Sequence, residues 1–184
     1  MKGARSMMNL LHKFLSRDHA DRSHIRKNFA HYFFSLPEHQ WITEEGVKGH
    51  FENLFARVPA KLLESLMQKY PVVFIKSEAM REHYSYRAGG VMRNTIVVFP
   101  EFQKLLRTNK GSAVAWLAHE LAFVIYELET ENLEPLMAEV EADKFVCDLG
   151  LTFELEELLL MLDETIEKRL RLTYLTINHF SVDN

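Results

Sequence analysis

The chain has 184 residues, of which 47% are hydrophobic and 26% charged, and its formal net charge is −4. Acidic and basic residues are interspersed, so the sequence offers neither a basic face for nucleic acid nor a polybasic segment for a membrane surface. It also contains no run of roughly 18 apolar residues, which a helix needs to cross a bilayer. The single cysteine, Cys147, allows no intramolecular disulfide, and we expect a cytoplasmic location.

Helices are predicted for the first part of the chain, residues 1–70. Apolar side chains recur at helical spacing from about Met7, and they predict several amphipathic helices. Residues 71–100 have a different character, because the β-branched runs at 72–75 and 94–99 predict strands, with 83–86 as a third strand of the same small sheet.

The second half is predicted to be helical again. A loop at 108–112 offers a cap for a strong helix that ends near Glu129, and the next helix begins at Pro135 and ends at Gly150 within the segment 111–150. Residues 151–184 predict one long C-terminal helix. Its inward face is expected to be Leu155, Leu158, Leu159, Leu162, Ile166 and Leu170. One domain is expected to span residues 1–184.

Each of these two central helices carries a motif of possible metal-binding residues. His119-Glu120 matches the start of the H-E-x-x-H signature, in which two imidazoles one turn apart bind zinc and the glutamate is the general base. The second imidazole is replaced by Phe123. Further along the chain, Glu139 and Asp143 form an E-x-x-x-D pair on the next helix.

Together these segments resemble the catalytic core of gluzincin metallopeptidases, specifically the minimal forms called minigluzincins. The resemblance covers residues 84–149: a turn and strand at 87–98, the helix at 115–124, and the E-x-x-A-D-x-F sequence at 139–145. It implies an α+β, mostly helical zincin-like fold with a small three-stranded sheet packed on the active-site helix. The strand that it assigns to the substrate cleft is formed by Asn94, Thr95, Ile96, Val97 and Val98.

The resemblance also assigns roles to individual residues. His119 would be the first zinc ligand, Glu120 the general base, Glu139 the other protein ligand, and Asp143 a carboxylate that orients the imidazole. Because catalytic zinc generally has three protein ligands and a phenyl ring has no lone pair, Phe123 leaves the site one ligand short. We therefore expect no bound cofactor, with zinc only if another residue compensates.

Three functions remain open at this stage. In the first, the protein is a non-catalytic metallopeptidase homologue that binds a protein or peptide segment in the former cleft. In the second, it is a zinc peptidase whose missing ligand comes from His83 or Cys147. In the third, it is a helical structural or interaction domain unrelated to the peptidases.

A structural reading of His119 accompanies the first function. The imidazole would be packed in the core and hydrogen-bonded to Glu139 or Asp143 without a metal, with an aromatic cluster replacing the ion. That cluster would comprise Trp116, Phe123 and Tyr126.

Overall fold

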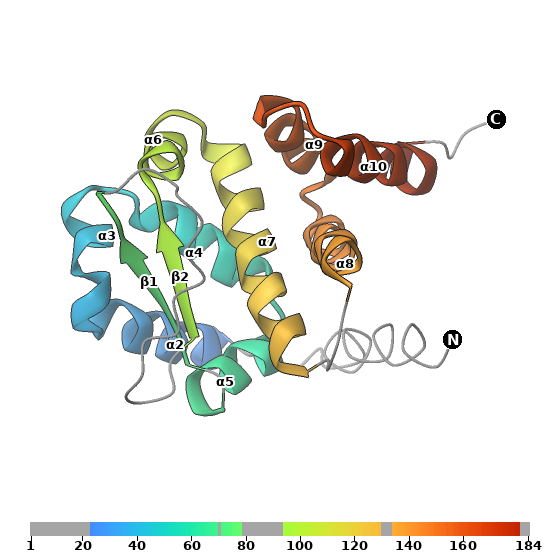
Figure 1. The fold of residues 1–184 in the computed structure, drawn as a ribbon. Coiled ribbons are helices and arrows are strands. Elements are labelled where there is room, and N and C mark those ends of the chain that lie inside the picture. Colours follow the sequence, from blue (N-terminus) through green and yellow to red (C-terminus); the bar gives the residue numbers. More distant parts are fainter. Residues whose placement is uncertain (1–22, 70, 79–93, 130–133, 181–184) are drawn as a thin grey trace. The chain divides into compact units, whose positions relative to one another are not determined.

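The computed structural model of the protein describes residues 23–69, 71–78, 94–129 and 134–180 (Figure 1). These residues are mostly helical and include one small sheet, in agreement with the composition. By its internal contacts the chain divides into two compact units, Met1–Lys104 and Leu105–Asn184. The single domain over residues 1–184 stays a prediction. None of the helices in the described ranges combines the length and apolar character that a bilayer crossing needs.

The described part of the first unit begins with helices, as predicted. They are α2 (Ser23–Ser35), η1 (Pro37–His39), α3 (Gln40–Glu44), α4 (Lys48–Arg57) and α5 (Ala60–Gln68). Their apolar faces meet in an aromatic core, where the rings of Phe29 and Phe55 lie 4.8 Å apart and perpendicular to each other, and those of Phe33 and Phe55 lie 5.0 Å apart. Edge-to-face contacts of this kind are favourable because the ring edge is positive and the ring face negative.

The sheet of the first unit consists of β1 (Val72–Lys76) and β2 (Asn94–Val98), which lie side by side in Figure 1. Both strands were predicted. They pair in parallel, with Phe74 opposite Ile96. The prediction of a three-stranded sheet is wrong for the described residues, which form two strands, and the proposed third strand at 83–86 lies outside them. In a parallel pair the connection has to return along the length of the strands before the second strand begins, whereas a tight hairpin turn joins only antiparallel strands.

A buried histidine supports the outer edge of β1. His39 is fully buried, with its ring centroid 3.8 Å from that of Phe33. Its Nδ1 lies 2.7 Å from the carbonyl oxygen of Phe33 and can only donate there, so Nε2 accepts the Phe74 N–H at 2.9 Å. Trp41 Nε1 donates to the Phe74 carbonyl oxygen at 3.0 Å. Side chains therefore satisfy both backbone groups of Phe74 on the side away from β2.

The helix α6 (Pro100–Thr108) closes one end of the sheet. Gln103 is buried, and its Nε2 donates to the carbonyl oxygens of Ser77 at 2.6 Å and Val98 at 3.0 Å. The amide group thereby joins the ends of both strands.

The described part of the second unit is helical. It contains α7 (Lys110–Glu129), α8 (Pro135–Asp148), α9 (Thr152–Met161), α10 (Ile166–Leu175) and the π-helical turn η2 (Thr176–Phe180). The predicted start of α8 at Pro135 is confirmed, and Gly150 follows that helix with φ at 73°, a left-handed conformation that glycine adopts without strain. Helix α7 packs against both α8 and α9, and α10 packs against α8 and α9.

Polar contacts fix the beginning of α7. Asn109 Oδ1 accepts the backbone N–H of Ser112 at 3.2 Å, which is a helix cap at the predicted loop. Glu157 of α9 accepts from Asn109 Nδ2 at 3.0 Å and from Ser112 Oγ at 2.8 Å. A carboxylate at this position also interacts favourably with the positive end of the helix. The contacts hold α7 and α9 together at that end.

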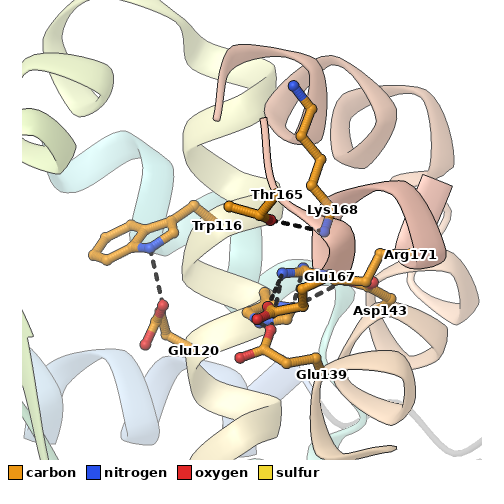
Figure 2. A network of polar contacts seen from close by, with 9 residues as sticks. Trp116, Glu120, Glu139, Asp143, Thr165, Glu167, Lys168 and Arg171 are labelled. Carbon is orange, nitrogen blue, oxygen red and sulfur yellow. Dashed lines mark hydrogen bonds and ion pairs between the residues drawn. The ribbon is translucent and has the colours of Figure 1, made fainter. Parts of the chain in front are cut away.

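The prediction of one long C-terminal helix is wrong, because the chain breaks between α9 and α10. Thr165 caps α10 by accepting the Lys168 N–H at 3.1 Å (Figure 2), and Lys168 Nζ donates to the Leu162 carbonyl oxygen at the end of α9 at 2.8 Å. The break changes the face that α10 buries. Ile166 and Leu170, predicted to point inward, are 78% and 46% exposed, whereas Lys168, Arg171 and Leu175 are buried.

Replacement of His39 tests the support of β1. We expect His39→Leu to lower the free energy of unfolding by about 2–4 kcal/mol, because it leaves the Phe74 N–H and the Phe33 carbonyl without these buried partners. Urea denaturation followed by circular dichroism measures the change. His31→Leu, at an exposed position on α2, is the control and is expected to change stability by less than about 0.5 kcal/mol. Equal stability of the two variants would contradict this role of His39.

Candidate functional site

The second unit brings together three of the residues singled out in the sequence. His119 lies on α7, and Glu139 and Asp143 lie one turn apart on α8. The two imidazole nitrogens face different carboxylates: Nε2 is 2.9 Å from Glu139 Oε2, and Nδ1 is 3.1 Å from Asp143 Oδ1. The His119 and Asp143 side chains are 8% and 1% exposed, and that of Glu139 is 24% exposed. The spacing in the sequence therefore predicted a real cluster.

A fourth member, Arg171 of α10, was not predicted. Its Nε and Nη2 donate to the two oxygens of Asp143 at 2.8 and 2.7 Å, a bidentate pair. Its Nη1 lies 2.9 Å from Glu139 Oε2, the same oxygen that His119 contacts. Glu167, one turn earlier on α10, lies 3.8 Å from Nη1 and is largely exposed. The guanidinium thus bridges both carboxylates of α8.

These four side chains are called the quartet below: His119, Glu139, Asp143 and Arg171. Their mutual interactions favour the charged form of every member. Burial lowers the pKa of His119, but its hydrogen bonds to Asp143 and Glu139 outweigh that effect and bring the pKa to about 9. Burial raises the pKa of Glu139 and Asp143, yet the hydrogen bond from His119 and the nearby positive charges lower both below their ordinary values. The result is two cations and two anions in one buried cluster.

The protonation state of the imidazole follows from this arrangement. Two ionised carboxylates face the two ring nitrogens of His119, so both nitrogens carry a proton and donate. Arg171 Nη2 approaches His119 Nδ1 at 3.3 Å, but with both groups protonated this is a contact between donors that share Asp143 Oδ1 as acceptor.

Glu120 does not belong to the quartet. Figure 2 shows Trp116 and Glu120 on one side of α7, and Glu139, Asp143 and Arg171 on the other. Glu120 Oε1 accepts from Trp116 Nε1 at 3.1 Å. Successive helical residues point about 100° apart, so the His119-Glu120 motif divides between two faces of the helix.

The other predicted site residues lie elsewhere. Phe123 is half-buried on α7, and the predicted partners Glu139 and Asp143 both lie at the ring nitrogens of His119. Cys147 is half-buried, and its pKa is raised to about 11, mainly by burial, so the thiol stays protonated near neutral pH. His83 lies outside the described residues. Residues Asn94–Val98 form β2 in the first unit.

The quartet does not fit a zinc ion. Zinc needs deprotonated ligands, whereas His119 presents N–H groups to Glu139 and Asp143. Glu139 Oε2 already accepts from both His119 and Arg171. A divalent cation at that oxygen would also lie beside two positive groups. The described ranges contain no group of three or more His, Cys, Asp or Glu side chains arranged to hold a metal.

No protein-family model, no curated protein and no solved structure matches this chain. The gluzincin resemblance stays an interpretation of the sequence.

Arg171 is the residue that sequence reasoning missed, and a local signal for it was present. The single predicted helix over residues 151–184 placed Ile166 and Leu170 on the inner face, which turns Arg171 away from it. Thr165 before Ile166 and Glu167 is a helix-start signal, because threonine caps helices and acidic residues favour the first turn. A predicted helix start at that point would have changed which residues of α10 are expected to face inward.

The raised pKa of His119 predicts a pH-dependent stability. Its folded pKa lies above the ordinary value of 6.5, so the stabilisation is complete below about pH 6.5 and is lost as the pH rises through about 9. We expect the free energy of unfolding to fall by up to about 3 kcal/mol between pH 6.5 and pH 10. Urea denaturation across this range measures the change, and the ¹⁵N shifts of the imidazole report its protonation.

The control for this prediction is His119→Gln, which has no titrating group at this position and should show a flatter profile in the same pH range. A wild-type imidazole that titrates near pH 6.5 would contradict the charged quartet.

Proposed function

We propose that this protein is a non-catalytic metallopeptidase homologue that binds a protein or peptide segment and does not hydrolyse it. The observation that supports this most directly is the geometry of the quartet, in which Glu139 and Asp143 each lie within 3.1 Å of both His119 and Arg171. The residues that would hold a metal in the family thus make hydrogen bonds and ion pairs within the quartet instead. We keep the cytoplasm as the proposed location, since the single cysteine requires no oxidising compartment.

The chemistry of peptide hydrolysis supports the same proposal. In a zinc peptidase the metal lowers the pKa of a bound water from 15.7 to about 7, and a glutamate then takes its proton. Phe123 cannot ligate the metal, and Glu120 is hydrogen-bonded to Trp116 on another face of α7 (Figure 2). Neither the activated water nor a general base beside it is then available.

For the binding function we propose the edge of β2 as the contact. The bonds from the Asn94 N–H to Pro71 and from the Ser77 N–H to Val98 show that residues 94, 96 and 98 face β1. By the alternation of a parallel pair, the backbone groups of Thr95 and Val97 face the opposite edge. At β1 the outer edge is closed at Phe74 by His39 and Trp41. An extended segment would therefore add beside β2, with main-chain hydrogen bonds as its source of affinity.

Metal content and peptidase activity test the loss of catalysis. We expect the purified protein to contain far less than stoichiometric zinc and, with zinc added, to cleave a fluorogenic peptide library no faster than Glu120→Gln. Elemental analysis and initial rates are the measurements. Tight, stoichiometric zinc that disappears in Glu139→Ala would overturn the non-catalytic proposal in favour of a compensated metal site.

A displayed peptide library tests the binding edge. Selection against the immobilised wild-type protein is expected to yield extended peptides whose binding is at least about tenfold weaker to Val97→Pro, because proline removes the outward N–H. Val97→Ala keeps that N–H and is the matched control. Circular dichroism establishes that both variants fold. Equal binding of the selected peptides to both folded variants would exclude strand addition at β2.

A further inference from the structure

The guanidinium of Arg171 makes contacts that a surface ion pair does not. It donates to both oxygens of Asp143, at 2.8 and 2.7 Å, and its Nη1 lies 2.9 Å from Glu139 Oε2. Its side chain is only 7% exposed. The group that ties these carboxylates together beside His119 is thus a cation supplied by α10 (Figure 2).

We propose that Arg171 is a built-in cation that stands in place of a metal ion and excludes one. It supplies the positive charge that the carboxylates of α8 require, and it reaches them from a helix outside the E-x-x-x-D motif. The inference rests on the proposed function, because it interprets α7 and α8 as a former metal site. It adds that Phe123 is one of two obstacles to zinc.

The two obstacles are physically different. Phe123 lacks a lone pair, so the site is one ligand short. Arg171 occupies Glu139 Oε2 and places a positive charge where a dication would bind. Restoring the missing imidazole removes the first obstacle and leaves the second. Removing the guanidinium alone leaves a site with too few ligands. Both changes are therefore needed, and their effects on zinc affinity should be strongly non-additive.

The test is a double-mutant cycle on the full-length chain with zinc ion as the probe. Phe123→His and Arg171→Met are each expected to bind zinc weakly, whereas the double variant should bind one zinc ion about 100-fold more tightly than either. Competition with a chromophoric chelator measures the affinity. Zinc should also raise the melting temperature of the double variant and leave that of Phe123→His unchanged.

Arg169 provides the matched control on the same helix. It is exposed and pairs with Glu164 at 2.6 Å, away from His119 and the carboxylates of α8. Phe123→His with Arg169→Met should therefore bind zinc like Phe123→His alone. If zinc binds Phe123→His as tightly as the double variant, Arg171 does not exclude the metal and the inference is overturned.

Chemical rescue gives a readout that does not depend on creating a metal site. Arg171→Ala should melt at a lower temperature than wild type, and millimolar ethylguanidinium should restore part of the loss, whereas ethylammonium at the same concentration should restore less because it cannot make the bidentate pair. Absence of any rescue would show that a cation at this position is not what the quartet requires. Arg171→Gln replaces the methionine and alanine variants if these do not fold.

The outcomes separate this inference from the proposed function. Zinc-dependent hydrolysis by the wild-type protein would overturn the proposed function. A folded double variant that binds no zinc would overturn the metal-replacing role of Arg171, while wild-type inactivity would leave the non-catalytic proposal standing.

Discussion

The buried carboxylate of Asp143 and the half-buried carboxylate of Glu139 on α8 set the main constraint on the second unit, because an ionised group away from water has to be matched by opposite charge. Asp143 is 1% exposed, and α8 itself offers it no cation within a turn that reaches it. The match comes from His119 on α7 and Arg171 on α10. Helices distant in the sequence are therefore joined by charge as well as by apolar packing, and removal of any one member would leave an uncompensated buried charge.

The break between α9 and α10 follows from the same constraint. A continuous helix would present Ile166 and Leu170 to the core, but the chain ends α9, caps α10 with Thr165 and turns Arg171 inward. The cost of the break is limited because Lys168 donates to the Leu162 carbonyl at the exposed end of α9. Two apolar side chains, Ile166 and Leu170, are left at the surface, while Arg171 reaches both oxygens of Asp143.

How much the sequence could predict depended on how local the signal was. The resemblance of the two motifs to metallopeptidases placed His119, Glu139 and Asp143 in one site, and β1, β2 and the start of α8 were found from β-branched runs and from Pro135. Arg171 and His39 were missed for a common reason. Both are polar residues buried by partners far away in the sequence, whereas periodicity assigns polar residues to the solvent face. The burial of His39 is explained by its hydrogen bonds with the backbone carbonyl of Phe33 and the N–H of Phe74.

The direction of the pKa shifts bears on what the quartet can do. A catalytic acid or base works best when its pKa lies near the ambient pH, and enzymes raise the pKa of carboxylates or lower that of cations to achieve this. Here the shifts go the other way: the pKa of His119 rises to about 9, and the pKa of Glu139 and Asp143 falls below the ordinary value. The surroundings favour the charged form of every group, and the pKa values move away from neutral pH. Such a cluster stabilises a scaffold, and His119-Glu120 alone is insufficient evidence for hydrolytic chemistry.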